Sequence, residues 1–279
     1  MSSAGCIGEA WRQAARRIDR LDARLLLEHV CGCTHTDLIA HPERRIGAAE
    51  AQRFETLVSR REAGEPLAYL IGCAWFYGLE FAVTPAVLIP RPDTEVLVDQ
   101  AVQRTQGIER PRVLDLGTGS GIVAILVERL SAQSVVTAVD VSAAALDVAR
   151  ANATRHGVSV RFVEGDWYAP LGNERFELIV SNPPYVVEGD PHLQQNGLPF
   201  EPQNALTDGI AGGDGLACIR SIIAGASGHL CPGGWLLMEH GYDQAVEVRR
   251  LLEAAGFSEV DSWRDTAGIE RVSGGRIVC

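Results

Sequence analysis

Lysine is absent from this chain: all 25 basic residues are arginines, against 36 aspartates and glutamates. The net charge of −11 falls on residues 79–279, because residues 1–78 carry ten arginines and ten acids. Sequence-independent binding to nucleic acid requires basic side chains that neutralise phosphates. The acidic second part therefore argues against a stable nucleic-acid partner, and it is compatible with a basic protein partner.

Membrane, export and metal signals are also missing. No apolar run approaches the ~20 residues of a membrane span, and residues 1–8 lack the basic start and apolar stretch of a signal peptide. The seven cysteines are an odd number without a framework spacing, which argues against structural disulfides. Cys31 and Cys33 lie near two histidines, but their spacing matches no usual zinc site, so we interpret them as small apolar side chains at a helix end. We expect a cytoplasmic monomer without a bound metal.

The first part of the chain has the apolar periodicity of helices. Between residues 8 and 63, apolar side chains recur every three to four positions. Asp19 is a candidate N-cap for a helix that runs through 21–30, and Gly64 is a candidate stop for a later helix. These signals predict a small helical bundle over residues 1–72.

The remaining chain alternates between strand and helix patterns. An aromatic run predicts a linking β-hairpin within 73–90, with its turn near Gly78. Domain 91–279 is predicted to be α/β, with a doubly wound, mostly parallel, seven-stranded Rossmann-like sheet. The strand-like runs are 113–116, 135–139, 160–163, 178–180 and 235–238, with two more strands between 258 and 278. The helix-like runs are 122–130, 143–156, 216–226 and 244–255.

A glycine-rich turn follows the first of these strands, in the sequence Val-Leu-Asp-Leu-Gly-Thr-Gly-Ser-Gly at 113–121. Glycines let the backbone approach a ligand closely and adopt positive φ. The pattern is not the dinucleotide signature, because Ile122 stands where that signature has its last glycine. A turn without a ligand is the alternative. The strand–turn–helix setting instead predicts a cofactor site formed by Gly117, Thr118, Gly119, Ser120 and Gly121.

Acidic and aromatic residues follow the next two strands. Asp140 ends the second strand, where a carboxylate can accept hydrogen bonds from both hydroxyls of a ribose. Alone it could equally cap a helix, a role for which Ser142 competes. After the third strand, Asp166 could accept from an adenine amino group and Trp167 could cover the ring. The alternative for Trp167 is core packing.

The sequence Ser-Asn-Pro-Pro-Tyr at 181–185 follows the fourth strand and suggests the chemistry. The side-chain oxygen of Asn182 and the carbonyl of Pro183 are two acceptors that could hold a planar NH₂ group. The prolines fix φ and hence the direction of that carbonyl, and Tyr185 could stack on the planar group. A plain proline turn would explain Pro183 and Pro184 but not their neighbours. Ligands bind at the carboxyl ends of parallel strands, so this loop and the glycine turn should face one crevice.

Together these motifs resemble class I S-adenosylmethionine-dependent methyltransferases that modify planar NH₂ nitrogens. Four further stretches resemble the release factor glutamine methyltransferase family, also called HemK or PrmC. They are Glu-Pro-Leu-Ala-Tyr-Leu-Ile-Gly at 65–72, Leu-Ile-Pro-Arg-Pro-Asp-Thr-Glu at 88–95, Asp-Pro-His-Leu at 190–193 and Phe-Glu-Pro at 200–202.

The resemblance implies methyl transfer from S-adenosylmethionine to the glutamine of a Gly-Gly-Gln motif in peptide chain release factors. It implies a substrate clamp and catalytic site at Asn182, Pro183, Pro184 and Tyr185. The implied cofactor contacts are Gly117, Thr118, Gly119, Ser120, Gly121, Asp140, Asp166, Trp167 and Asn182.

Two other functions fit part of these patterns. An adenine-specific methyltransferase acting on DNA or RNA would share the Asn-Pro-Pro-Tyr loop, but it would need basic grooves to hold an extruded base. A cofactor-sensing module without catalysis is disfavoured by the intact loop. Residues 1–72 contain none of the motif residues, so we hypothesise that they recognise the protein substrate. The alternative is that they only stabilise the catalytic domain.

Overall fold

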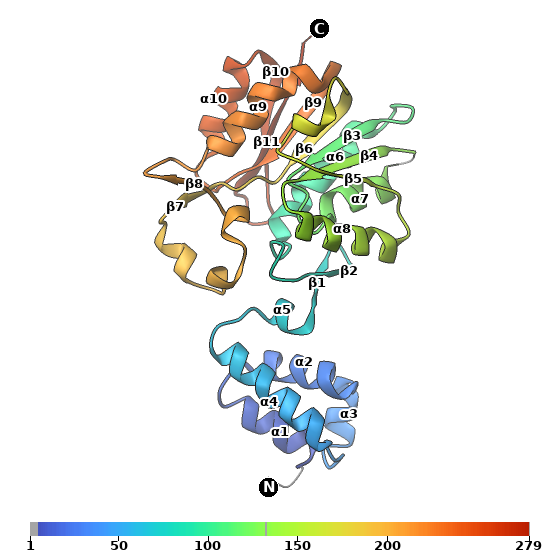
Figure 1. The fold of residues 1–279 in the computed structure, drawn as a ribbon, viewed down its shortest axis with the longest axis vertical. Helices are drawn as coiled ribbons and strands as arrows, with labels where there is room; N and C mark the ends of the chain where they lie inside the picture. The colour runs from blue at the N-terminus through green and yellow to red at the C-terminus, as the bar shows by residue number, and fades with distance from the viewer. Residues whose placement is uncertain (1–4, 132, 279) are drawn as a thin grey trace. The chain divides into compact units, whose positions relative to one another are not determined.

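The computed structural model describes residues 5–131 and 133–278 (Figure 1). Helices come first along the chain, and from residue 95 onward helices and strands alternate. The chain divides into two units. One comprises Met1–Cys73 with Gln194–Phe200, and the other comprises Ala74–Leu193 with Glu201–Cys279. The short stretch Gln194–Phe200 thus belongs to the first unit although it is distant in sequence from the rest of it.

The first unit is helical. Asp19 caps α2, as predicted, because its carboxylate accepts from the backbone N–H of Leu21 at 2.7 Å. Gly64 adopts φ 98° two residues beyond the end of α4, in the left-handed conformation common after helices. The helices are α1 (Ile7–Ala14), α2 (Arg20–Cys31), α3 (His35–Ala40), α4 (Ala48–Glu62) and α5 (Leu67–Ile71).

Cys31 and Cys33 are buried in the core of this helical unit. Burial raises the pKa of Cys31 to about 11 and raises that of Cys33 as well, because the thiolate would lose its hydration. Their interpretation as small apolar side chains is therefore confirmed. Within the described residues, no group of three or more His, Cys, Asp or Glu side chains is arranged to hold a metal ion.

A hairpin joins strands β1 (Cys73–Phe76) and β2 (Leu79–Ala82). Both turn residues have positive φ, 52° at Tyr77 and 72° at Gly78. Two such residues give a turn whose twist matches that of the flanking strands, and glycine adopts this conformation without strain. The predicted turn position at Gly78 is confirmed.

The second unit contains a seven-stranded sheet in the order β10-β11-β9-β6-β3-β4-β5. The pairs among β9, β6, β3, β4 and β5 are parallel, and β11 is antiparallel to both β9 and β10. This confirms the predicted mostly parallel sheet. The strands are β3 (Arg112–Leu116), β4 (Val135–Asp140), β5 (Arg161–Glu164), β6 (Phe176–Ser181), β9 (Leu230–Glu239), β10 (Phe257–Arg264) and β11 (Glu270–Ile277).

Helices cover both faces of this sheet because successive strand residues point to opposite sides. Val113 packs in one core cluster with residues of α6 and α7, whereas Leu114 packs in another with residues of α9 and α10. Buried on both faces, the strands read as nearly continuous apolar runs. The helices are α6 (Glu95–Thr105), α7 (Ile122–Leu130), α8 (Ala143–His156), α9 (Ala217–His229) and α10 (Ala245–Ala254).

Helix α6 was not predicted. The helix begins at Glu95, just after the prolines at 85, 90 and 92. Leu97, Val98 and Ala101 form its fully buried stripe, at a spacing that could have indicated a helix. Pro85 lies in a turn, Pro90 in the irregular stretch that follows it and Pro92 in the short turn η1, so the prolines precede the helix without entering it.

Shorter elements connect the larger ones. Strands β7 (Val186–Glu188) and β8 (Thr207–Ala211) form a separate two-stranded parallel pair. The 3₁₀ turns are η1 (Pro92–Thr94), η2 (Ala169–Leu171), η3 (Pro191–Gln194), η4 (Leu198–Phe200) and η5 (Gln203–Ala205). In the part of the chain that is described, every helix is too short or too polar to cross a bilayer.

Candidate active site

A cavity of about 330 Å³ opens at the carboxyl ends of β3, β4 and β6. The strand order reverses between β3 and β6, and open α/β sheets bind their ligands at such a switch point. Most of the predicted site residues line the cavity. They are Gly117, Thr118, Gly119, Ser120, Asp140, Asp166, Trp167, Asn182 and Pro184. Gly121, Pro183 and Tyr185 are not part of its lining.

The glycine turn between β3 and α7 forms one wall of the cavity. The backbone N–H groups of Gly117 and Thr118 donate to the carbonyl of Val139 at the end of β4, at 2.9 and 3.1 Å. Gly117 has φ 69°, and an added Cβ would lie 3.4 Å from the ring of Trp167. The absence of a side chain here leaves the backbone open to a ligand.

Gly121 has a different reason to be glycine. It has φ 82° at the start of α7, and an added Cβ would lie 3.0 Å from the Cβ of Ala149 and 3.1 Å from Ile125. Gly121 therefore permits close packing of α7 against α8. Close packing of the two helices therefore explains why residue 121 is glycine, and Gly121 does not line the cavity.

Asp140 holds the cavity wall together. One carboxylate oxygen accepts from the N–H of Gly119 at 2.8 Å, and the other accepts from the N–H of Ser142 at 2.9 Å. Ser142, not Asp140, is the N-cap of α8, because its hydroxyl accepts from the N–H of Ala145. The helix-cap alternative for Asp140 is thus wrong. Burial raises the pKa of Asp140 above its ordinary value.

The residues after β5 lie on the same cavity. Asp166 is exposed and Trp167 is half-buried. The Trp167 ring lies over Gly117 and also packs against the core cluster on the α9–α10 side of the sheet. Both interpretations of Trp167 therefore apply in part. Its φ of 44° is an uncommon conformation for a bulky residue and is retained only where the surroundings enforce it.

Asp115 is a site residue that our sequence reasoning missed. It lies in β3, is almost fully buried and lines the cavity. Its carboxyl oxygen accepts from the hydroxyl of Thr118 at 2.6 Å and from the N–H of Ala124 at 3.2 Å. It therefore ties the glycine turn to the first turn of α7. An acid inside an otherwise apolar strand was the available signal.

Asp115 leads to a prediction about pH and stability. Burial raises its pKa from an ordinary 3.8 to about 7. Because the folded-state pKa exceeds the unfolded one, its favourable contribution is complete below pH ~4 and is lost as pH rises through about 7. The wild type should therefore lose free energy of unfolding as the pH rises from about 6 to about 8, and Asp115→Asn should not. Across this range the difference in free energy of unfolding should change by roughly 1 kcal/mol in favour of Asp115→Asn.

Thermal unfolding of both proteins across this pH range measures the difference. Asp147→Asn is the matched control, because Asp147 is exposed on α8 and pairs only with Arg150 among the described residues. A difference between wild type and Asp115→Asn that stays constant with pH would show that Asp115 does not titrate near neutrality.

The Asn-Pro-Pro-Tyr loop begins where β6 ends beside β3. Ser181 is buried and donates its hydroxyl to the carbonyl of Leu116 at 2.7 Å, which joins the two strand ends. The amide nitrogen of Asn182 donates to the hydroxyl of Thr94 at 3.3 Å. Its side-chain oxygen makes no hydrogen bond to the described residues, so this oxygen is left as an acceptor at the cavity.

Tyr185 is anchored rather than placed in the cavity wall. Its hydroxyl donates to Oε1 of Glu239 at 3.1 Å, and its carbonyl accepts from Nε2 of Gln244 at 3.0 Å. The ring packs beside the core cluster on the α9–α10 side of the sheet. Of the four loop residues, Asn182 and Pro184 line the cavity, whereas Pro183 is buried behind it.

A second wall of the cavity comes from residues 86–91. Glu201 is buried and accepts from the N–H of Ile89 at 3.1 Å and from the guanidinium of Arg91 at 2.5 Å. The motifs at 88–95 and 200–202 are thus joined by a single carboxylate. Other lining residues that were not predicted are Thr94, Asn204, Ala205, Thr207, Asp208 and Cys218.

These features define the class of protein. A seven-stranded sheet with one antiparallel insertion, a glycine turn after β3 and a polar loop after β6 form the fold of class I methyltransferases. A methyltransferase from Pyrococcus furiosus shares this fold, with a TM-score of 0.56, 20% identity and coverage of 81% of this chain and 98% of that chain. A T. thermophilus 16S rRNA N2 methyltransferase in complex with AdoMet and guanosine shares it with a TM-score of 0.55 and 20% identity. That match covers 74% of this chain and 49% of that chain.

Sequence comparison identifies the family within this class. Residues 9–72 match the PrmC N-terminal domain, and residues 92–196 match the methyltransferase small domain. The release factor glutamine methyltransferase of Burkholderia pseudomallei is 52% identical over 94% of each chain. That of Bordetella pertussis is 53% identical over 92% of this chain and 95% of its own length. The chain belongs to the release factor glutamine methyltransferase family.

Proposed function

We propose that this chain transfers a methyl group from S-adenosylmethionine to the side-chain amide nitrogen of a glutamine in peptide chain release factors, within a Gly-Gly-Gln motif. The observation that carries the proposal is the orientation of Asn182. Its amide nitrogen is engaged by Thr94, which leaves its oxygen to accept from a substrate NH₂ group. The names of the curated relatives, release factor glutamine methyltransferases, support the same substrate.

The cavity fits the proposed cofactor in size and charge. About 330 Å³ lies at the lower end of the range of small-molecule sites. Four acids line it, and Arg91, the lining cation among the described residues, is paired with Glu201. A negative lining favours a ligand with a sulfonium and an amino group, both positively charged. The acids are Asp115, Asp140, Asp166 and Asp208.

Roles for the cofactor-side residues follow from these positions. Asp140 would accept from the ribose hydroxyls, Asp166 from the adenine amino group, and Trp167 would cover the adenine ring. The turn from Gly117 to Ser120 would present its backbone to the ligand, and Gly121 would allow that turn to pack against α8. When bound, S-adenosylmethionine supplies an electrophilic methyl group on a sulfonium.

The substrate side must overcome the weak nucleophilicity of an amide nitrogen, whose lone pair is delocalised into the carbonyl. Asn182 and the carbonyl of Pro183 would accept the two N–H bonds and orient the nitrogen toward the methyl group. The N–C bond forms as the S–C bond breaks, and one N–H proton then leaves the nitrogen. Pro184 would lie against the planar group, and Tyr185, anchored by Glu239, would complete the clamp by holding the loop in place.

An adenine-specific methyltransferase is the second candidate, since adenine also presents a planar NH₂ group. Extracting a base from a duplex requires basic surface to hold the backbone, and residues 79–279 carry the whole net negative charge of −11. The names of the curated relatives also favour the glutamine substrate. A purely cofactor-sensing module is disfavoured by the free acceptor at Asn182.

The division of labour along the chain is part of this proposal. We assign residues 1–72 to recognition of the release factor, 73–90 to the linking hairpin and 91–279 to methyl transfer. The helical unit has its own buried core, while the cavity is lined only by residues of the second unit among those described. We also propose a cytoplasmic monomer, and the six free cysteines at described positions accord with a reducing compartment.

One experiment tests substrate and domain roles together. The intact chain and a variant lacking residues 1–72 are incubated with radiolabelled S-adenosylmethionine and either purified release factor or a short Gly-Gly-Gln peptide. The intact chain should methylate the release factor efficiently, and mass spectrometry should place one methyl group on the glutamine. The truncated chain should lose most activity on the release factor, down to its low level on the peptide, with unchanged cofactor affinity.

Circular dichroism of the truncated chain is the control for folding. Absence of methyl transfer by the intact chain to any release factor would refute the proposed function. A folded truncated chain that methylates the intact factor at the full rate would refute only the recognition role of residues 1–72.

A further inference from the structure

The segment that follows β9 lies beside the Asn-Pro-Pro-Tyr loop. Strand β9 pairs with β6 in parallel, with Met238 opposite Ser181. The two strands therefore lead into connections at the same edge of the sheet. On β6 this connection is the loop at 182–185. On β9 the corresponding stretch is Glu-His-Gly-Tyr-Asp-Gln at 239–244, which is the last strand residue, Glu239, and the connection 240–244. Apart from the anchor at Glu239, residues 239–244 have no role in the proposed mechanism so far.

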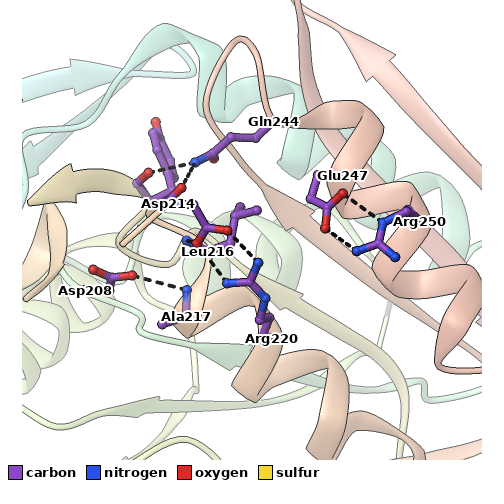
Figure 2. Close-up of polar contacts among 9 residues, drawn as sticks. Asp208, Asp214, Leu216, Ala217, Arg220, Gln244, Glu247 and Arg250 are labelled. Carbon is purple, nitrogen blue, oxygen red and sulfur yellow. Dashed lines mark hydrogen bonds and ion pairs between the residues drawn. The ribbon is translucent and has the colours of Figure 1, made fainter. Parts of the chain in front are cut away.

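Two side chains of this segment hold Tyr185 at opposite ends. Glu239 accepts from its hydroxyl at 3.1 Å, and Nε2 of Gln244 donates to its carbonyl at 3.0 Å. The orientation of the Gln244 amide is determined, because its Oε1 accepts from the N–H of Gly241 at 2.8 Å. Nε2 donates to two backbone carbonyls, those of Tyr185 and Asp214, and Figure 2 shows the Gln244 side chain directed toward Asp214.

A third contact restrains the same carbonyl. Gly215 has φ 73°, and an added Cβ would lie 2.4 Å from the carbonyl oxygen of Tyr185. The turn that contains Gly215 is itself held in place by the bidentate ion pair between Asp214 and Arg220, at 2.8 and 2.6 Å (Figure 2). The carbonyl of Tyr185 therefore lies between a hydrogen-bond donor and a closely packed backbone.

Glu239 also supports Asn182 through Thr94. The Thr94 hydroxyl accepts from the amide nitrogen of Asn182 at 3.3 Å, and it lies close enough to the Glu239 carboxyl group to lower the pKa of that group. The second carboxyl oxygen of Glu239, Oε2, is buried without a hydrogen-bond partner among the described residues. Glu239 is 1% exposed, so this network is shielded from solvent. One buried carboxyl group thus connects the first and last residues of the Asn-Pro-Pro-Tyr loop.

We propose that Glu239 and Gln244 are positioning residues for methyl transfer, which fix the loop so that the oxygen of Asn182 and the carbonyl of Pro183 meet the substrate NH₂ group. This inference rests on the proposed function. Neither residue lines the cavity, so both act through the loop rather than on the substrate. Misplacement of reacting groups by about 1 Å can cost on the order of 100-fold in rate.

Gln244→Glu is the sharpest test, because the new side chain has the same size and can still accept from Gly241. It replaces the donor that faces Tyr185 with an acceptor, and a carboxylate repels a carbonyl oxygen. Near pH 8 we expect kcat on the release factor to fall about 10- to 100-fold. The KM and the dissociation constant for S-adenosylmethionine should remain unchanged, which a general loss of structure would not produce.

Lowering the pH should restore activity, because a protonated glutamic acid can again donate to the Tyr185 carbonyl. The ratio of variant to wild-type kcat should therefore rise as the pH is lowered from about 8 to about 6. The charged or titratable groups around this position are the pairs Asp214–Arg220 and Glu247–Arg250 (Figure 2) and, along the chain, Asp243 and His240. Burial lowers the pKa of His240 below its ordinary value, which favours the neutral imidazole over this pH range in both proteins.

Those neighbours do not account for such a recovery. Arg220 lowers the pKa of Asp214 to about 2, and Arg250 lowers that of Glu247 below its ordinary value, so neither pair titrates in this range. Beyond the Tyr185 ring lies Glu239, whose pKa burial raises to about 7. Its titration occurs in both proteins and cancels in the ratio. Gln106→Glu, at an exposed side chain that makes no hydrogen bond to the described residues, is the matched control.

A second pair of variants decides the outcome if Gln244→Glu fails to fold. Glu239→Gln retains an acceptor for the Tyr185 hydroxyl and should keep kcat within about threefold, whereas Glu239→Leu should lose at least about tenfold. Wild-type kcat in folded Gln244→Glu near pH 8, or equal loss at both pH values, would overturn the proposal. So would equal activity of the two Glu239 variants.

Asn182→Ala in the same assay distinguishes failure of the positioning role from failure of the proposed function. If that variant is inactive while Gln244→Glu is fully active, only the positioning role is wrong. If Asn182→Ala itself is fully active, the proposed site is wrong as well.

Discussion

Asn182→Ala should abolish most turnover, with a loss of at least ~100-fold in kcat, because it removes an acceptor that orients the substrate nitrogen. The nitrogen of this side chain is engaged by Thr94, so its oxygen is left without a partner among the described residues and would be available to the substrate. A weak nucleophile depends strongly on orientation, since its lone pair must face the methyl group in line. The effect should therefore appear in kcat.

The measurement is steady-state methylation of release factor, together with calorimetry of S-adenosylmethionine binding. Cofactor affinity should stay close to that of the wild type. Asn173→Ala is the control, because Asn173 is exposed in the same unit and outside the cavity. Near-normal turnover in Asn182→Ala would refute its role, and a large loss of affinity would instead assign Asn182 chiefly to the cofactor.

Asp140→Ala should weaken S-adenosylmethionine binding by roughly 1.5–3 kcal/mol, as expected for lost hydrogen bonds to a charged group. This corresponds to about 10- to 150-fold in the dissociation constant. The structure adds a second reason. The carboxylate accepts from the N–H groups of Gly119 and Ser142, so alanine would also leave the glycine turn without its support.

Calorimetry of the folded variant measures the affinity directly. Asp147→Ala is the matched control, because Asp147 is an exposed acid on α8. Unchanged affinity in Asp140→Ala would remove the residue from the cofactor site. Tight binding of NAD by the wild type, without binding of S-adenosylmethionine, would overturn the assignment of the cofactor itself.

Local patterns in the sequence determined most of the second unit. Helices predicted at 122–130 and 143–156 have the same bounds in the structure, as α7 and α8. Strands were recognised because buried parallel strands read as apolar runs between turns. Their ends were less accurate: β6 begins at Phe176 and β9 at Leu230, before the predicted starts. Strand ends depend on which neighbour pairs with them.

The sequence alone also predicted that the glycine turn, Asp140 and Asn182 lie at one edge of the sheet, because the carboxyl ends of parallel strands lie together. It could not separate residues of the cavity wall from those behind it. Gly121 belongs to the same motif as Gly117, yet its close neighbour is Ala149 on α8. Tyr185 follows Asn182 by three residues, yet it is anchored by Glu239 and lies outside the cavity lining.

The sequence by itself determined the strands of the large sheet and most of the helices between them, the family and the residue types at the site, because these depend on short motifs and on side-chain periodicity. Only the tertiary structure decided which distant side chains meet. Glu201 and Arg91 are 110 positions apart, and Gln244 and Tyr185 are 59 apart. Such pairs form only when the packed sheet places separate connections at one edge, and local sequence patterns do not predict contacts between residues so far apart in the chain.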